Sequence, residues 1–481
     1  MCLAAIPSQA AGSDAALVAL ADRDAPAVLA EIGGAMPGDP PGTQRAYDRA
    51  RDLMIALDEV RPTAGCRRLA GAARRFALAA VRVPEAVDRL VPARPARARA
   101  AAAHRALRSA RGGCVPAGAG PAAAPPRGLS PGPGEAFFGT VVADTPAGSE
   151  EAEVLLDGRV VSRVAVRRGR ARATVTGAPG RHELRVRFLA RGIPLGTTVA
   201  AGVRLLPAAS AVARRPTRPD AVAAARLGAI GRSAGPALGL WVQDLSAGTA
   251  AGWNSRTRFP AASTVKLALM VGALARDPAT PAAGPLGYEV AQVGGWSSNL
   301  AANRLLVALG GSEAGGAAVA QRVLARLGAV DSTYPGGYIV GTGIAGLPPD
   351  PARRSVPTVS RRVTTAADLA RILFLVHAAA TGDRAARAAT GLSTRAARVL
   401  IAALLASEQR GDNLSLLAPG VPPGTPIAQK NGWIRAARHG AAIIYTPSGP
   451  RIAVMLSHSD AGMSLPAARA LGARVAAVAA R

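Results

Sequence analysis

The stretch Phe259-Pro260-Ala261-Ala262-Ser263-Thr264-Val265-Lys266 runs directly into an apolar helix predicted over residues 267–274. Residues three apart in a helix lie on the same face, so Ser263 and Lys266 are expected to point the same way. Free amide hydrogens and the dipole at a helix N-terminus favour negative charge developing near Ser263. A neutral Lys266 can take the proton of Ser263. The stretch therefore predicts a serine nucleophile with its base one helical turn behind it.

Lysine is almost absent from this chain. Of its 58 basic residues, only Lys266 and Lys430 are lysines. Arginine stays protonated at any working pH, whereas a buried lysine can lose its proton and act as a base. A chain with this bias should keep lysine where arginine cannot serve, which makes both lysines candidate functional residues.

Two further segments carry residues suited to acyl transfer. Ser297-Ser298-Asn299 lies on a predicted loop that opens a helix running to Leu309. Ser and Asn two apart on a loop can relay a proton and hold a substrate amide, although both are also common helix caps. Lys430-Asn431-Gly432-Trp433 lies on a predicted strand, where glycine lets a ligand approach the backbone. Lys430 would face an acyl or carboxylate group and lower the proton affinity of Lys266 by like-charge repulsion.

Together these segments resemble the motifs of the serine penicillin-recognising enzymes, and most closely those of the class A β-lactamase branch. That family carries S-x-x-K, then S-D-N, then K-T-G or K-S-G. Here the three places are occupied by 263–266, 297–299 and 430–432, and residues 363–369 look like the helix start that follows the family's omega loop. The resemblance spans roughly residues 220–481.

The resemblance implies a role for each matching residue. Ser263 would be the nucleophile, Lys266 the general base and Ser297 a proton relay to the leaving nitrogen. Asn299, Lys430, Asn431 and Gly432 would bind the substrate, and the backbone amides of Ser263 and Trp433 would form the oxyanion hole. The resemblance implies no metal and no organic cofactor.

Several positions depart from the family pattern. Ser298 replaces the aspartate of the second motif, Asn431 replaces a hydroxyl residue, and the short gap between Ser263 and Ser297 indicates a trimmed helical block. Class A β-lactamases use an omega-loop glutamate to activate the hydrolytic water. Residues 328–362 contain no glutamate, Glu313 lies too early, and Asp331 and Asp350 fit the pattern poorly. We therefore predict that Ser263 acylates but deacylates slowly.

The resulting expectation is a serine hydrolase acting on a small-molecule acyl donor, either a β-lactam or a peptidoglycan-like peptide. Two alternatives stay open: a cell-wall D,D-peptidase or esterase, and a non-catalytic protein that binds wall fragments or β-lactams. The formal net charge of +28 comes from arginines spread along the whole chain, so no nucleic-acid partner is expected. We expect a monomer.

A rival nucleophile is present in Gly231-Arg232-Ser233-Ala234-Gly235, which matches G-x-S-x-G. The nucleophile elbow of α/β-hydrolases needs a strand before the serine and a helix after it. Here a helical run precedes the serine and a strand follows, so a helix-to-strand turn is predicted. His439 is predicted to lie in a hairpin turn over 438–440.

The chain reads as multidomain. Residues 1–12 resemble the end of a signal peptide, which indicates a secreted or cell-envelope protein. A helical region over 13–114 is followed by a Pro/Gly/Ala linker over 115–135. Short alternating strands over 136–206 predict a small, immunoglobulin-like β-sandwich, and a second linker covers 207–219. Residues 220–481 predict an α+β domain of the β-lactamase/transpeptidase type: an antiparallel sheet with flanking helices and a helical block.

Within these regions, helix breaks are expected at Pro92 and Pro95. The closing strands are expected over Ile427–Ile434, Ala441–Thr446 and Ile452–Ser457, before a final helix from Pro466 to Ala480. Cys66 and Cys114 bracket a helical stretch, and the sequence leaves open whether they pair. The cysteines form no CxxC pair, so no zinc site is expected.

Overall fold

The computed structural model describes residues 14–60, 62, 64–88, 92–114, 128–276, 285–338, 361–406 and 415–480. These residues divide into two compact units. One contains the described residues of 1–125 together with 298–300 and 338, and the other contains the remaining described residues. All of the described strands belong to the second unit.

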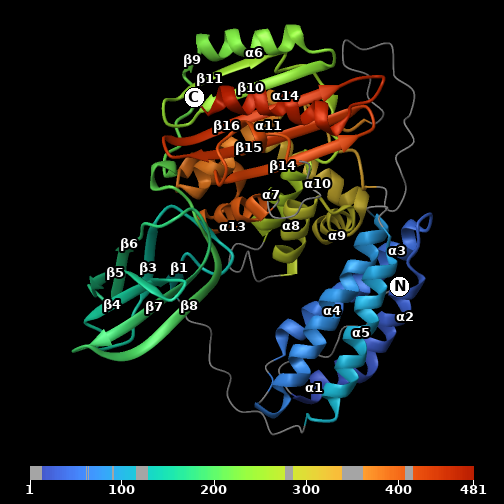
Figure 1. The fold of residues 1–481 in the computed structure, drawn as a ribbon, viewed down its shortest axis with the longest axis vertical. Coiled ribbons are helices and arrows are strands. Elements are labelled where there is room, and N and C mark those ends of the chain that lie inside the picture. Colours follow the sequence, from blue (N-terminus) through green and yellow to red (C-terminus); the bar gives the residue numbers. More distant parts are fainter. Residues whose placement is uncertain are drawn as a thin grey trace. The chain divides into compact units, whose positions relative to one another are not determined.

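The described part of the first unit is mainly α-helical, with a short π-helical segment over Leu20–Asp24 and a 3₁₀ turn over Ala64–Cys66 (Figure 1). The helices are α1 (Asp14–Ala19), α2 (Ala25–Gly34), α3 (Pro40–Glu59), α4 (Arg67–Asp88) and α5 (Arg94–Arg111). Tyr47, Phe76 and Leu107 are fully buried between them. Aromatic residues make up only 3% of the chain, so alanines such as Ala73 and Ala77 of α4 fill much of the remaining core. Small side chains allow the helices to pack closely.

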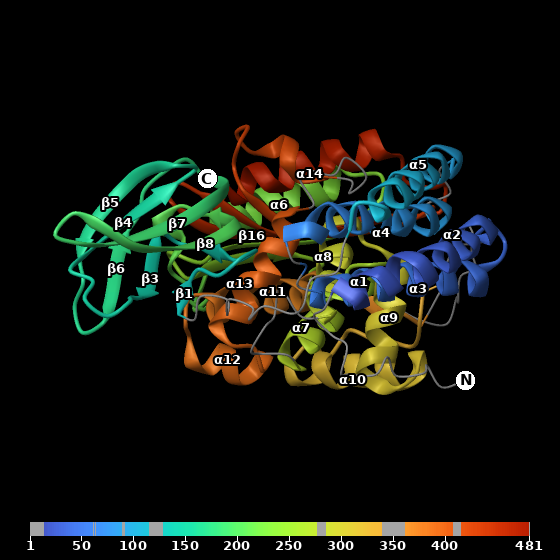
Figure 2. The ribbon, with the colours of Figure 1, turned by 90° about the horizontal axis from the view of Figure 1, so that it is seen from below.

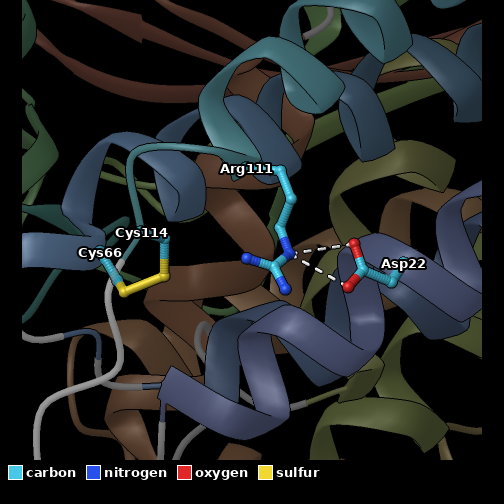
Figure 3. The surroundings of a disulfide bond; sticks show 4 residues. All are labelled: Asp22, Cys66, Arg111 and Cys114. Carbon is cyan, nitrogen blue, oxygen red and sulfur yellow. Dashed lines mark hydrogen bonds and ion pairs between the residues drawn. A yellow bond between two sulfur atoms is a disulfide. The ribbon is translucent and has the colours of Figure 1, made fainter.

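Cys66 and Cys114, whose pairing the sequence left open, form a disulfide bond (Figure 3). Cys66 directly precedes α4 and Cys114 follows α5, so the bond joins the start of one helix to the end of the next. Beside it, the Arg111 guanidinium donates to both carboxylate oxygens of Asp22 at 3.1 and 3.0 Å (Figure 3). The end of α5 is thus held by a covalent bond and by an ion pair.

Of the two prolines expected to break a helix, Pro92 and Pro95, only the first lies outside the helices. Pro92 is non-helical, as predicted, but Pro95 does not break a helix and instead lies in the first turn of α5. Proline is tolerated there because the first backbone N–H groups of a helix have no intrahelical acceptor. Pro84 lies inside α4, which continues to Asp88.

The second unit begins with two small sheets. One has the strand order β1 (Leu129–Ser130), β3 (Thr140–Asp144), β6 (Arg170–Thr174). The other has the order β2 (Ala136–Phe137), β8 (Ile193–Leu205), β7 (Gly180–Ala190), β4 (Glu151–Leu156), β5 (Arg159–Ala165). Val141 of the first sheet and Val154 and Val186 of the second belong to one buried core. The immunoglobulin-like assignment of this region stays a prediction.

The end of the predicted 115–135 linker is ordered structure. Leu129 pairs with Ala143 in the β1–β3 ladder. Glu135 is buried, and its carboxylate lies 2.6 Å from the Nε of Arg395. Pro/Gly-rich composition concealed these contacts because a two-residue strand and a single buried ion pair leave no periodic signal. Residues 115–127 of the range lie outside the described residues.

The larger sheet has the order β14 (Ile427–Ile434), β15 (Ala437–Thr446), β16 (Gly449–His458), β10 (Ala237–Asp244), β11 (Thr249–Trp253), β9 (Arg218–Pro219). All neighbours are antiparallel except β11 and β9. Helices α6 (Ala221–Ser233) and α14 (Leu465–Ala479) lie side by side along it (Figures 1 and 2). Leu227 and Val475 of these helices share a core with Leu240 and Val242 of β10.

A helical block completes the domain. It comprises α7 (Lys266–Arg276), α8 (Pro285–Trp296), α9 (Asn299–Gly310), α10 (Glu313–Arg326), α11 (Ala366–Ala380), α12 (Arg384–Thr390) and α13 (Thr394–Leu405). Helix α11 contacts β10, β15 and β16, and α13 contacts β14. Side chains alternate between the two faces of a strand. Trp241 and Gln243 therefore point toward α11, away from the face that α6 and α14 cover.

Strand β15 begins earlier than predicted. The predicted turn over 438–440 is strand, and the chain instead reverses at residues 435–436, with Ile434 paired to Ala437. A two-residue hairpin loop keeps the strands in register from their first pair, which places His439 opposite Gly432. The polar Arg-His-Gly triplet resembled a turn, but His439 and Gly440 are buried inside the sheet.

Within the described residues no single helix is long and apolar enough to span a membrane. The bent pair α12 and α13 meets that criterion only when the two helices are taken together.

Candidate active site

Ser263 is held by a short strand and a tight turn. Strand β12 (Phe259–Pro260) pairs with β13 (Val363–Thr364), and Ala262 then adopts a φ of +47°. A non-glycine residue in this region is strained and persists only where its surroundings fix it. The backbone N–H of Thr264 donates to the Ala261 carbonyl at 3.0 Å, and its hydroxyl donates to the same oxygen at 2.7 Å. This double contact closes the turn that presents Ser263.

Lys266 follows Ser263 by one backbone turn. Its N–H donates to the Ser263 carbonyl at 3.2 Å, so the two residues span one turn, and α7 begins at Lys266. Ser263 therefore lies in the turn that leads into the helix. The Lys266 side chain is fully buried, and its Nζ donates to the Ser297 carbonyl at 2.7 Å. A buried amine is thus placed beside the second motif.

Ser297 follows the end of α8 and turns the chain sharply. Its N–H donates to the Val293 carbonyl at 3.1 Å, and its φ is +58°. The left-handed conformation costs a serine energy that a glycine would not pay. Ser298 is buried and Asn299 begins α9. The contribution of Asn299 to substrate binding stays a prediction.

Lys430 is the second lysine at Ser297. It is fully buried on β14, and its Nζ donates to the Ser297 hydroxyl and to the Asn431 carbonyl, both at 2.7 Å. Burial lowers the pKa of Lys430 from 10.5 to about 7, because desolvation penalises the charged amine. An exposed strand lysine would show neither property. Both lysines of the chain thus bind the same serine, one through its carbonyl and one through its hydroxyl.

Gly432 brings β14 against the turn that carries Ser263. A Cβ atom at this position would lie 2.9 Å from the Ser263 nitrogen and 3.0 Å from both the Ala261 oxygen and the Thr264 nitrogen. These are backbone atoms, which cannot move aside as a flexible side chain can. Among the described strands β14 is the edge of its sheet, so one side of its backbone has no strand partner. The third motif therefore passes directly beside Ser263.

Two neighbours of Gly432 have opposite environments. Asn431 is buried, whereas Trp433 is 56% exposed. The Cζ of Arg438 lies 5.2 Å from the Trp433 ring centroid, within cation–π distance. Trp433 thus offers an exposed aromatic face one residue after the glycine that contacts the turn carrying Ser263.

His439 is a residue that sequence reasoning misplaced. It is fully buried in β15, where its Nε2 donates to the Pro260 carbonyl at 2.6 Å and its Nδ1 accepts from the Ser457 N–H at 3.2 Å. Burial lowers the pKa of His439 from 6.5 to about 4, so the ring is neutral at neutral pH. A neutral ring can make both bonds at once. His439 anchors the strand that leads into Ser263. The apolar residues that follow His439 in the sequence were the one feature that could have indicated its place inside strand β15.

The remaining candidates from the sequence are acidic residues near the predicted omega loop and the serine of the G-x-S-x-G segment. Asp331 forms an ion pair with Arg258, at 2.8 Å, which gives it a structural partner. Glu313 is the first residue of α10. Most of the predicted omega loop, including Asp350, lies outside the described residues. Ser233 ends α6 just before β10, so the G-x-S-x-G segment is the predicted helix-to-strand turn.

The family comparison bears directly on these three motifs. The model of the beta-lactamase enzyme family matches residues 222–279 and 290–481, a range that contains Ser263, Ser297 and Lys430. The chain belongs to the beta-lactamase enzyme family. Its C-terminal region accordingly has a β-lactamase-like α+β fold, with a helical block beside a largely antiparallel sheet.

Solved structures of similar proteins cover a little over half of this β-lactamase-family chain. A beta lactamase from Xanthomonas campestris pv. campestris is 22% identical, covering 54% of this chain and 96% of its own, with a TM-score of 0.41. A beta-lactamase from Desulfarculus baarsii is 22% identical, covering 53% and 96%, with a TM-score of 0.40. The protein PBP-A is 20% identical, covering 55% and 97%, also with a TM-score of 0.40. No curated protein sequence matches this chain.

Proposed function

We propose that this chain is a serine hydrolase that takes the acyl group of a β-lactam, or of a related amide or ester, onto the Oγ of Ser263. The observation that carries the proposal is the convergence of both lysines on Ser297. Lys266 Nζ lies 2.7 Å from the Ser297 carbonyl, and Lys430 Nζ lies 2.7 Å from its hydroxyl. In a chain with only two lysines, this convergence supports a role for each in proton transfer.

The first step is attack on the acyl carbon. Lys266, as the free amine, accepts the Ser263 hydroxyl proton while the Ser263 oxygen bonds to the carbonyl carbon. The carbonyl oxygen becomes an oxyanion, and the backbone N–H groups of Ser263 and Trp433 are the proposed donors to it. The close passage of Gly432 beside the Ser263 nitrogen supports this pairing.

The second step is loss of the leaving nitrogen. The carbon–nitrogen bond breaks, and the Ser297 hydroxyl gives its proton to that nitrogen. Ser297 then regains a proton from the ammonium of Lys430, with which it already shares a hydrogen bond. Protonated Lys430 also attracts the carboxylate of the incoming substrate, and Asn299 and Asn431 complete the proposed substrate contacts.

Release of the acyl group is proposed to be slow. Residues 328–362 contain no glutamate that could activate water as in class A β-lactamases. The same lack favours a second candidate, a cell-wall D,D-peptidase or esterase, in which another acyl donor meets the same Ser263, Lys266 and Ser297. The two candidates share the acyl-enzyme and differ in which donor turns over.

We further propose that the protein is secreted or attached to the cell envelope and acts as a monomer without nucleic acid. The Cys66–Cys114 disulfide supports the location, since such bonds persist mainly in oxidising compartments.

Pre-steady-state kinetics with a chromogenic cephalosporin tests this function. The expected trace is a rapid burst close to one equivalent of enzyme, followed by a slow linear phase. Ser263→Ala should abolish the burst, and Ser233→Ala, which removes the serine of the rival motif, should leave it unchanged. A D-alanyl-D-alanine peptide and an acetyl ester, assayed in parallel, identify a peptidase or an esterase by steady turnover. Fast linear release without a burst would contradict slow deacylation, and loss of the burst in Ser233→Ala would contradict the assignment of the nucleophile.

A further inference from the structure

A cavity lies on the helical side of the large sheet. It has a volume of about 410 Å³ and is bounded by β10, α11 and the segment 328–331. Two strands, β15 and β16, separate β10 from β14, which carries Lys430. Neighbouring strands lie about 4.8 Å apart, so the cavity wall at β10 is roughly 14 Å along the sheet from the candidate active site. It is a separate place in the fold.

The mouth of this cavity is rich in arginine. Arg215, Arg256 and Arg371 all line it and are exposed. Arg215 comes from the segment that precedes β9, so the residues that join the small sheets to the large sheet also line the cavity. Guanidinium groups bind carboxylates and phosphates through paired N–H donors.

Two aspartates also line the cavity, but both are already engaged. Asp331 forms the ion pair with Arg258, at 2.8 Å. Asp368 accepts from the Ser332 hydroxyl at 2.7 Å and from the Asp331 N–H at 3.0 Å. Arg371 is engaged as well, because its Nε donates to the Leu327 carbonyl at 2.6 Å. The three lining arginines still outnumber the two lining aspartates, and Arg258 offsets the charge of Asp331. The balance favours a ligand with negative charge.

The wall formed by β10 contains an unmet hydrogen-bond donor. Gln243 lines the cavity and is 3% exposed, and its side-chain oxygen accepts from the Trp241 ring nitrogen at 3.4 Å. Within the part of the chain that the structure describes, its Nε2 has no hydrogen-bond partner. A buried donor without an acceptor costs free energy. An acceptor atom on a bound molecule would satisfy it.

The rest of the wall is apolar. Trp241 and Phe374 bring aromatic rings to the cavity from β10 and α11, and Leu375 adds an aliphatic surface. A pocket with an apolar body, a few polar groups and a charged rim is typical of small-molecule sites.

We propose that this cavity binds a small organic anion with a flat apolar body, such as an aromatic carboxylate or an aromatic phosphate ester. The flat body lies against Trp241 and Phe374, the anionic group faces the three arginines, and an acceptor atom meets the amide of Gln243. This site is additional to the one around Ser263, and the proposal holds whether or not the proposed hydrolase activity does.

Isothermal titration calorimetry of the full chain tests the proposal with 1-naphthoate, 1-naphthyl phosphate and the neutral 1-naphthylmethanol. At least one anion should bind about tenfold more tightly than the alcohol, because the arginines contribute charge-assisted hydrogen bonds. The stronger of the two anions identifies the ligand as carboxylate or phosphate. Equal binding of the alcohol, or no binding of either anion, would overturn the proposal.

Variants locate the binding site. The double change Arg215→Gln/Arg256→Gln should weaken the anion about tenfold or more. Arg226→Gln, an exposed arginine on α6 across the sheet, should have no effect. Lys430→Met should also leave binding unchanged, since it alters only the candidate active site. A loss of binding in either of these two controls would contradict the assignment to this cavity.

Gln243→Leu separates a binding role from a structural one. It removes the unmet donor at similar volume but also the acceptor of the Trp241 ring N–H, so it should weaken the anion with little change in the midpoint of thermal unfolding of the free protein. Unchanged affinity for the anion in this variant would show that Gln243 does not contact the bound anion.

Discussion

The Nζ of Lys430 lies 2.7 Å from the Oγ of Ser297, at the end of a helix where Ser297 adopts a φ of +58°. The carbonyl of the same serine accepts from Lys266. Ser297 is thus held from two sides by buried amines that come from α7 and β14. Strained residues of this kind persist where surrounding contacts fix them, and they cluster at functional sites.

Replacing Ser297 separates its hydroxyl from its backbone. Ser297→Gly and Ser297→Ala both remove the proton relay, so acylation by a penicillin should fall roughly a hundredfold in each. Glycine adopts a positive φ freely, so Ser297→Gly should be about 1 kcal/mol more stable than Ser297→Ala. Stopped-flow acylation rates and urea unfolding measure the two effects. Acylation at the wild-type rate in the glycine variant would show that the Ser297 hydroxyl takes no part in the reaction.

The lowered pKa of Lys430 makes stability depend on pH. The pKa is about 7 when folded and returns toward 10.5 on unfolding, so between these values the unfolded chain binds a proton that the folded protein lacks. Stability from this residue is therefore fully present above pH 10.5 and is lost as the pH falls through 7. From pH 7 to 9 the wild type should gain about 2 kcal/mol relative to Lys430→Met. Chemical unfolding of both proteins at each pH measures this difference, and parallel pH profiles would contradict the lowered pKa of Lys430.

Gly432→Ala tests the contact between β14 and the turn that carries Ser263. The new Cβ would lie 2.9 Å from the Ser263 nitrogen, so the turn must shift and acylation should fall roughly a hundredfold. Gly440 on the paired strand is the matched control, because its Cβ would first meet the Leu417 side chain at 3.4 Å. Gly440→Ala should acylate within about threefold of the wild type. Equal losses in the two variants would show that the effect is general to the sheet.

His439 is expected to position Pro260, and through it Ser263. His439→Leu leaves a buried carbonyl and a buried N–H without partners, which should cost about 2–4 kcal/mol and slow acylation. His439→Gln has a donor and an acceptor that can restore both bonds, so it should retain most of the activity.

His439 should also make the free energy of unfolding fall at acid pH. The pKa of His439 is about 4 when folded and 6.5 when unfolded, so its contribution is complete above pH 6.5 and is lost as the pH falls toward 4. Between pH 7 and 5 the wild type should lose about 2 kcal/mol that His439→Gln does not lose. Urea unfolding at both pH values measures this change. An identical change in the two proteins would assign the fall at acid pH to other groups.

Sequence patterns predicted the fold of the C-terminal region well where the signal was periodic. Strand β14 was predicted with its observed bounds, and α14 within one residue at each end. The scarcity of lysine singled out Lys266 and Lys430 before any contact was known. In both cases a local feature of the chain was enough.

Features that depend on long-range contacts were not predictable in this way. His439 read as a turn residue, because nothing local shows that Pro260, far away in the sequence, supplies its acceptor. The strained φ of Ser297 and the contact at Gly432 likewise arise from segments that meet only in the folded chain. Pairing of Cys66 with Cys114 required the packing of α4 against α5.

Ser263 is proposed to form the acyl-enzyme and to release the acyl group slowly. Intact-mass spectrometry after incubation with benzylpenicillin tests this proposal with the wild type, Ser263→Ala and Ser233→Ala. The wild type and Ser233→Ala should gain the mass of one penicillin, the adduct should persist after excess drug is removed, and Ser263→Ala should gain nothing. An adduct on Ser263→Ala, or complete hydrolysis of the penicillin by the wild type with no adduct at any time, would contradict it.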